Sequence, residues 1–175
     1  MNAEQITARI LQHRWHRSFC LPRYTPWDWW ECDVFELTTA GYYREYEIKV
    51  TRPDFLNDAA KERFSQADRL DDRKVEKKHD LLMAHDPRGP VQFWYVVPEG
   101  LIKLREVPEW AGLIEIIISP PGGWRLYEKV LIEAPRLHGE KCHPKTVEHA
   151  RGVCYYRMHE LRNRLMLKKR APARS

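Results

Sequence analysis

The spacing of apolar residues predicts a helix at each end of the chain. In residues 3–16, Ile6, Ile10 and Leu11 follow one another at i, i+4 and i+5, and Trp15 lies one turn later. This spacing places the four side chains on one stripe of an amphipathic helix. Residues 145–168 are predicted to form the terminal helix.

Two hairpins and a buried strand are predicted between these helices. Residues 32–38 and 42–50 are expected to be strands, because a short polar turn containing Gly41 separates them. Residues 113–119 and 124–132 are expected to pair in the same way around the sequence PPGG. The apolar run VQFWYVV is typical of a buried strand.

The segments on either side of the first hairpin follow other patterns. Pro22 and Pro26 exclude a central strand over residues 19–30, which is therefore an edge strand or an irregular lead-in. A proline in the first turn predicts a helix over residues 53–70, with a second helical segment over residues 72–85. The order helix, strands, helix, strand, strands, helix predicts a mixed α/β domain.

The size and charge of the chain indicate how many domains it can form and what kind of partner it can bind. With 175 residues, of which 43% are hydrophobic, the chain can build one ordinary core, so we expect a single domain over residues 1–168 and a basic tail over residues 169–175. A formal charge of +5 is compatible with a polyanionic partner but does not require one. From residue 157 onward, Lys and Arg far outnumber the single acid Glu160. This segment is either a nucleic-acid arm or the solvated face of a last helix with a frayed tail.

The cysteines predict a reducing compartment. Cys20, Cys32, Cys142 and Cys154 form no C-x-x-C pair, so reduced thiols in the cytoplasm are expected. Nothing near the N-terminus has the apolar core of a signal peptide, and no run approaches the roughly 20 apolar residues that cross a bilayer, so no membrane partner is expected. Zinc ligation around Cys142 is disfavoured, because the Cys and His spacings match no common zinc pattern.

One strand of the first hairpin carries a charged face. Side chains alternate along a strand, so Glu45, Glu47 and Lys49 share one face of it. The ordinary explanation is a half-buried strand with a solvated face. A metal site would need a second carboxylate nearby, because a hard divalent cation prefers several oxygen ligands. Asp33, on the preceding strand, is the candidate.

The length of the hairpin loop decides whether Asp33 meets Glu47. A three-residue loop pairs the two, whereas a two-residue loop shifts the register by one and turns them to opposite faces. The longer loop is favoured, because its third position suits a left-handed Gly41, and because it sets Glu36 across from Arg44. Carboxylates gathered on one face without a cation would cost stability, so the cluster indicates a bound Mg²⁺ or Mn²⁺.

Asp33 followed by Glu47-Ile48-Lys49 on the next strand, after an N-terminal helix that bears an acid, resembles the PD-(D/E)XK nuclease superfamily. The stretches DVFELTTAGYYREYEIKVTRPDF, QFWYVVPEGLI and VPEWAGLIEI look more closely like the MmcB-like DNA-repair proteins and their phage-encoded relatives, over roughly residues 3–132. This resemblance implies a restriction-endonuclease-like core, with a mixed central sheet flanked by helices.

The resemblance also implies roles for individual residues. Asp33, Glu47 and the backbone carbonyl of Ile48 would ligate the metal. Glu4, on the first helix, would take the place of the helix acid that many members use as an outer ligand. Lys49 would orient or help deprotonate the attacking water and offset the charge that grows on the phosphate.

Two features depart from the superfamily pattern, and a basic segment extends the predicted site. Cys32 stands where the motif name has proline, and Glu45 adds an acid.

Positive side chains after the hairpin could anchor a DNA backbone or could be an exposed helix face. These are Arg52, Lys74, Lys77, Lys78 and His79.

The sequence therefore predicts a metal-dependent nuclease acting on DNA in repair, recombination or phage nucleic-acid processing. The first alternative is a catalytically inactive DNA-binding module that keeps the nuclease-like fold. The second is a structural or interaction protein whose acidic strand face contacts a partner.

Overall fold

The computed structural model describes residues 1–64, 74–118 and 125–170. Over these ranges the elements are α1 (Ala3–Arg14), β1 (Ser18–Tyr24), β2 (Cys32–Thr38), β3 (Tyr43–Ile48), α2 (Arg52–Asn57), a 3₁₀ turn (Asp58–Ala60), β4 (Glu62–Phe64), β5 (Val75–Lys77), α3 (Lys78–Met83), β6 (Gln92–Pro98), a second 3₁₀ turn (Leu104–Glu106), β7 (Ala111–Ile118), β8 (Leu126–Ile132) and α4 (Pro144–Arg170).

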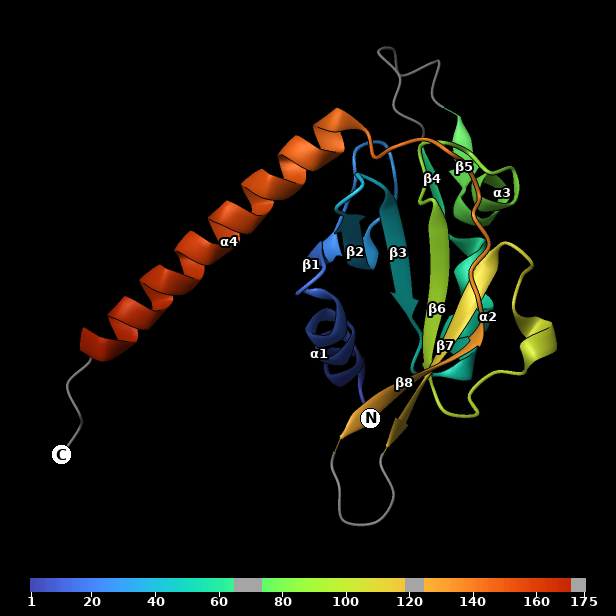
Figure 1. Ribbon diagram of the computed structural model, residues 1–175, viewed down its shortest axis with the longest axis horizontal. Coiled ribbons are helices and arrows are strands. Elements are labelled where there is room, and N and C mark those ends of the chain that lie inside the picture. The colour runs from blue at the N-terminus through green and yellow to red at the C-terminus, as the bar shows by residue number, and fades with distance from the viewer. Residues whose placement is uncertain (65–73, 119–124, 171–175) are drawn as a thin grey trace.

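Within the described residues, six strands form one mixed sheet in the order β1-β2-β3-β6-β7-β8 (Figure 1). The strands β3, β6 and β7 run parallel to one another, and the other neighbours are antiparallel. A small separate sheet joins β4 and β5. The predicted mixed α/β architecture, a central sheet flanked by helices, is therefore confirmed.

Both predicted hairpins are present. The strands β2 and β3 pair antiparallel, as do β7 and β8, although the PPGG turn itself lies outside the described residues. The proline-containing segment forms β1 at one edge of the sheet, where a missing backbone donor is tolerated.

The prediction of long helices after the first hairpin is wrong. Only the start of the expected 53–70 helix forms: α2 starts at a Thr51 cap with a proline in its first turn and ends at Asn57. The chain then tightens into the first 3₁₀ turn and enters β4. The expected 72–85 helix is split between β5 and the short α3. The helix propensity of this segment is overridden because β4 and β5 pair with each other. The intervening segment 65–73 lies outside the described residues.

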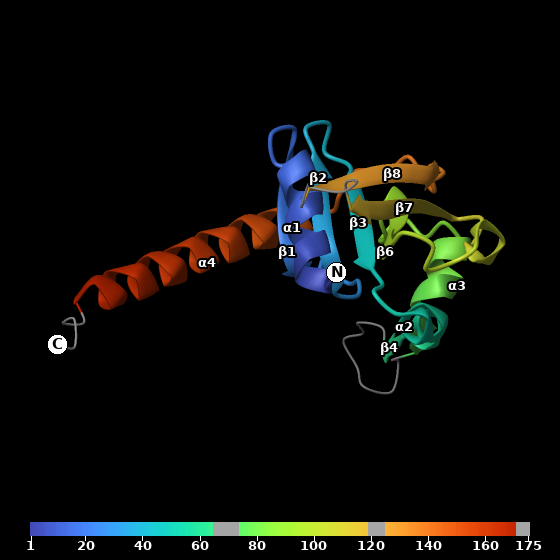
Figure 2. The same ribbon diagram turned by 90° about the horizontal axis from the view of Figure 1, so that it is seen from below.

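The two faces of the sheet bury different clusters. The α1 face packs Ile6 and Ile10 against Val34, Tyr46 and their neighbours. The opposite face packs residues of α2 and α3 against the sheet, including Phe55 and Leu82. Figure 2 shows α1 well separated from α2 and α3. Because strand side chains alternate, odd-numbered residues of β3 and β6 face the α2 and α3 side.

The hairpin register is the one that the three-residue loop predicts. Glu36 lies across from Arg44 and Val34 across from Tyr46. At the loop, the Gly41 amide donates to the Thr38 carbonyl, and Gly41 adopts a left-handed φ of 84°. Continuing this register by one residue places Asp33 beside the strand position of Glu47.

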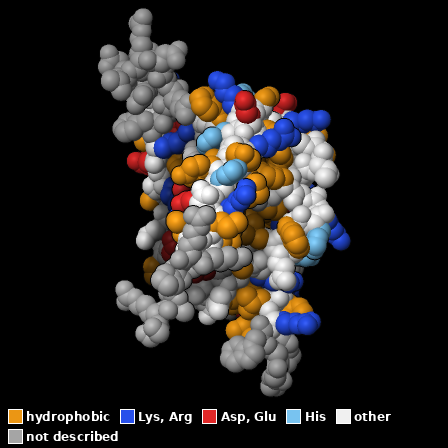
Figure 3. All heavy atoms as spheres, turned by 90° about the vertical axis from the view of Figure 1, so that its left-hand side faces the viewer, with side chains coloured by type: hydrophobic (Ala, Val, Ile, Leu, Met, Phe, Trp, Pro, Cys, Tyr) orange, Lys and Arg blue, Asp and Glu red, His pale blue; other side chains and the backbone are white. Residues whose placement is uncertain are grey.

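The terminal helix α4 leaves the body of the protein at an angle (Figure 1). It ends at Arg170, two residues beyond the predicted limit of 168. Hydrophobic, basic and histidine side chains are mixed on the side of the molecule from which it projects (Figure 3). Across the described part of the chain, no helix combines the length and apolar character needed to span a membrane.

Candidate active site

Asp33 and Glu47 meet at the ends of β2 and β3. The Asp33 Oδ2 atom accepts a 2.7 Å hydrogen bond from the Ile48 amide. The Lys49 amide donates to Val96 on the other side of β3, so the amide and carbonyl of Ile48 both point toward Asp33. The predicted acids and the Ile48 carbonyl are therefore neighbours.

Asp33 is a half-buried acid whose surroundings disfavour its ionised form. Burial and the nearby Glu47 charge raise the pKa of Asp33 to about 6, against the lowering effects of the Ile48 amide, Lys49 and Lys61. Its carboxylate also lines a groove that α1 and β1 form. Asp33 is thus the acid of the site that can reach a solvent-filled space.

Glu47 is surrounded by three lysines. Its Oε1 atom lies 3.0 Å from Lys49 Nζ and is also bonded by Lys61, and its Oε2 atom lies 3.0 Å from Lys78 Nζ. Burial would raise the pKa of Glu47, but the three ammonium groups outweigh it and lower the pKa below its usual value. Glu47 is therefore an ionised carboxylate in the protein interior.

A second acid, Asp58, joins this cluster from the 3₁₀ turn. Its Oδ1 atom lies 2.7 Å from Lys49 Nζ and 2.8 Å from Lys61 Nζ. Its Oδ2 atom accepts from Tyr95 and lies 2.9 Å from His79 Nε2. Burial raises the pKa of Asp58, but the His79 contact and the two lysines lower it by more. Asp58 thus fixes the position of Lys49.

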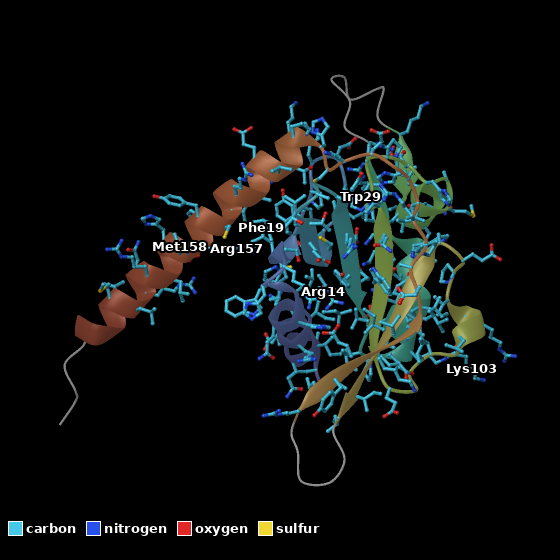
Figure 4. The ribbon with its side chains drawn as sticks, in the orientation of Figure 1. Arg14, Phe19, Trp29, Lys103, Arg157 and Met158 are labelled. Carbon is cyan, nitrogen blue, oxygen red and sulfur yellow. The ribbon has the colours of Figure 1, made fainter. Side chains whose placement is uncertain are left out.

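Glu45 forms the floor of the cluster. It is fully buried, it accepts hydrogen bonds from Trp29 Nε1 at 2.9 Å and Tyr43 at 2.5 Å, and it lies 2.5 Å from Lys78. Burial raises the pKa of Glu45, with the Lys78 charge opposing it. Trp29 reaches this position from the loop between β1 and β2 (Figure 4). Glu45, Glu47 and Lys49 therefore do lie on one face of β3, but that face is buried and not exposed to solvent.

The predicted phosphate anchors have different environments. Arg52 is exposed and pairs with Glu106, and Lys77 is exposed and lies 3.4 Å from Glu62. Lys74 is exposed. The prediction for Lys78 is wrong, because its ammonium is fully buried against Glu45 and Glu47 and cannot reach a DNA backbone in this structure.

Two predicted residues have unexpected contacts. The His79 ring is mostly buried and contacts Asp58 and Tyr95. Glu4 is well exposed, and its carboxylate lies 3.7 Å from Arg23, on the same groove as Asp33. Glu4 is therefore near the site but is not drawn into the charged cluster.

A divalent cation at this strand edge would require a lysine to be displaced from Glu47. No group of three or more Asp, Glu, His or Cys side chains within the described ranges is arranged as a preformed metal site. Asp33, Glu47 and the Ile48 carbonyl are the oxygen groups that would hold such an ion, and a cation there would offset both the burial and the Glu47 repulsion that raise the pKa of Asp33. The ion would have to replace Lys61, the most exposed of the three lysines, on Glu47.

Sequence reasoning missed Asp58 and Lys61. Both fall in a segment whose pattern predicts a continuous helix, where they would be ordinary surface residues three positions apart. Only the 3₁₀ turn and the entry into β4 direct them toward Lys49 and Glu47. No signal in the sequence identifies this contact.

Comparison with known proteins bears on the fold. No family model matches the chain, and no curated protein matches it. A solved structure of a protein of unknown function from Silicibacter pomeroyi is similar, with a TM-score of 0.62 and 17% identity over 93% of this chain and 92% of that chain. The likeness shows that the two proteins share a fold along almost their whole lengths.

Proposed function

We propose that this protein is a divalent-metal-dependent nuclease that hydrolyses DNA phosphodiester bonds. The observation that carries the proposal is the convergence of Asp33, Glu47 and Lys49, with Asp33 bonded to the Ile48 amide and Lys49 Nζ 3.0 Å from Glu47. The antiparallel strands β1 to β3, followed by the parallel β6, support a PD-(D/E)XK-type core. An aspartate, a Glu-x-Lys and this strand order together favour a nuclease over an unrelated ion-pair cluster.

Asp33, Glu47 and the Ile48 carbonyl would hold the Mg²⁺ or Mn²⁺ ion. When bound, the ion supplies a more acidic water and stabilises negative charge on the phosphate. Asp33 carries one negative charge toward the groove, and Glu47 keeps its own in the interior. The Ile48 amide fixes the orientation of Asp33.

Lys49 acts as a fixed positive charge. Burial would lower its pKa, but Glu47 and Asp58 raise it by more, so its ammonium stays protonated. A protonated ammonium can donate to a water or a phosphate oxygen but cannot accept a proton. Of the two roles that the sequence predicts for Lys49, the structure thus favours orientation and charge stabilisation over deprotonation of water.

The substrate would approach through the groove beside α1. Asp33 lines this groove together with Arg23 and Arg157, which supply positive charge close to the acid. Arg23 is well exposed and has a left-handed φ of 47°, a strained conformation that is more frequent at functional sites. These features support a phosphate backbone passing over Asp33.

The lysines around Glu47 favour a second candidate, a catalytically inactive DNA-binding module with the same fold. Three ammonium groups already neutralise Glu47, so the cluster is complete without a metal. This candidate predicts DNA binding that a chelator does not change, and no cleavage with any metal.

A cleavage assay separates the two candidates. Plasmid, single-stranded and branched DNA are incubated with the protein and Mg²⁺ or Mn²⁺. We expect Asp33→Ala and Lys49→Ala to lower the rate at least a hundredfold, because each removes a group at the reacting phosphate. Glu99→Ala, at an exposed position on a loop, is the matched control and should keep full activity. Equal cleavage by wild type and both site variants would discard the nuclease assignment.

A further inference from the structure

The outer part of α4 is a helix with little support from the body of the protein. Its inner part is anchored: Tyr24 donates to the Thr146 carbonyl, and Arg157 donates to the carbonyls of Pro22 and Arg23. Figure 4 shows Arg157 on the side of α4 that faces the body. Residues 158–170 continue beyond this anchor for about 20 Å, at 1.5 Å per residue.

An apolar stripe runs along this helix. Cys154, Met158, Leu161 and Leu165 are spaced by four, three and four residues, which is the spacing of the core positions of a coiled coil. Met158, Leu161 and Leu165 are 58%, 59% and 53% exposed. At 100° per residue, the stripe lies roughly a quarter turn from the anchoring residues. Cys154, at its inner end, packs against the core, whereas the body leaves Met158, Leu161 and Leu165 exposed. We call these four residues the α4 seam.

Positive charge flanks the α4 seam on both sides. Arg162 lies on one flank and Arg164 on the other, whereas Arg157 is engaged with the carbonyls of Pro22 and Arg23. The nearest acid, Glu160, is already bonded to Arg164 at 2.5 Å. The surface is therefore an aliphatic strip between two basic edges.

The chemistry of this surface selects among three occupants. A second copy of the chain would bring arginine against arginine at both edges, in either helix orientation. A nucleic acid would satisfy the arginines but would leave Met158, Leu161 and Leu165 in water, because phosphate and sugar offer them no apolar surface. A helix with its own apolar strip and acidic edges satisfies both the leucines and the arginines.

We propose that α4 is a docking arm for an acidic amphipathic helix of another protein. The partner helix lies along the α4 seam, buries Met158, Leu161 and Leu165, and places Asp or Glu opposite Arg162 and Arg164. This role is independent of the charged cluster around Glu47, from which the proposed nuclease activity comes.

Fluorescence anisotropy with a designed peptide tests the proposal. The probe is a labelled four-heptad peptide with Leu at its core positions and Glu at its flanking positions, and the comparison peptide has Lys in place of Glu. We expect the full-length chain to bind the acidic peptide at least tenfold more tightly than the basic one. Leu161→Ser and Leu165→Ser should each weaken the binding at least tenfold.

Leu167→Ser is the matched control. Leu167 is 68% exposed on the opposite side of α4, so the substitution removes a leucine from the same helix without touching the seam, and binding should be unchanged. Circular dichroism checks that the three variants keep equal helix content. Equal binding of both peptides, or equal loss in all three variants, overturns the proposal.

Two other outcomes also overturn it. A dimer in sedimentation equilibrium that Leu161→Ser dissociates would show that a second copy occupies the seam. Loss of duplex DNA binding in Leu161→Ser, with no binding of the acidic peptide, would assign the seam to nucleic acid.

Discussion

The two faces of the central sheet each bury a charged cluster, and the clusters differ in their basic residues. On the α1 face, Arg14 lies 2.8 Å from Glu128 and 3.9 Å from Glu36, and its guanidinium stacks over Tyr46. On the α2 and α3 face, the acids are paired with lysines instead. The first cluster joins α1 to β2 and β8, whereas the second surrounds the strand ends where Asp33 is exposed to a groove.

The choice of base indicates what each cluster does. The guanidinium of Arg14 is planar and makes several directed contacts at once, which suits a permanent link between elements. An ammonium is a point charge on a flexible stem and can exchange one oxygen for another. A lysine cluster beside two acids can therefore reorganise around a cation or a phosphate, while the arginine cluster cannot do so without loosening α1.

Lys78→Met should give the largest effect. It leaves Glu45 and Glu47 buried without their shared cation, so we expect a loss of about 3–5 kcal/mol in the free energy of unfolding, measured by urea denaturation at pH 7.5. Lys77→Met changes an exposed neighbour and should cost less than about 0.5 kcal/mol. A loss below about 1 kcal/mol for Lys78→Met would mean that the lysine cluster contributes little to folding.

Arg14→Met should cause the next largest loss of stability. It removes the contacts to Glu128 and Tyr46 and should lower the free energy of unfolding by about 2–3 kcal/mol, with Arg17→Met as an exposed control. DNA cleavage per folded molecule should stay unchanged, because Arg14 does not line the groove beside α1 and its contacts are to Glu36, Glu128 and Tyr46 rather than to Asp33, Glu47 or Lys49. Reduced cleavage at equal folded fraction would break the contrast between the two clusters.

Asp33→Asn should raise the free energy of unfolding, whereas the two preceding substitutions lower it. The pKa of Asp33 is raised to about 6 from an ordinary 3.8, which means that the folded state binds the proton of Asp33 more tightly than the unfolded state does. The free energy of unfolding of the wild type therefore falls as the pH rises from about 3.8 through 6. In chelator-treated buffer at pH 8, the variant should be more stable by about 1–2 kcal/mol, and below about pH 4 the gain should vanish. Asp86→Asn should instead destabilise at pH 8, because Arg88 lowers the pKa of Asp86. A pH-independent gain for Asp33→Asn would contradict the assignment.

Lys61→Met should have the smallest effect on stability, under about 1 kcal/mol, because its side chain is 35% exposed. By removing one of the two ammonium groups on Glu47 Oε1, it should tighten Mn²⁺ binding about threefold to tenfold, measured by titration calorimetry. Lys103→Met is the control, because this exposed lysine at the N-cap of the second 3₁₀ turn (Figure 4) makes none of the contacts of the cluster. Unchanged Mn²⁺ affinity would show that Lys61 does not occupy the cation position.

Much of the frame of the candidate site was predictable from local rules. The alternation of Glu45, Glu47 and Lys49 specifies one face of a strand, and Gly41 specifies the loop length. Together they fix the register that pairs Glu36 with Arg44 and brings Asp33 toward Glu47. These features depend on neighbours in the sequence or on a single turn, and such interactions are similar in every fold.

The environment of the site depends on contacts between distant residues. The sequence by itself determined that one strand of a hairpin would carry Glu45, Glu47 and Lys49 on one face. Only the tertiary structure decided that this face is buried, that Asp58 and Lys61 reach it from a short turn, and that Lys78 points inward. The reason is that a charged side chain has no intrinsic preference for a buried position, and its cost is offset only by partners that the whole fold brings within about 3 Å.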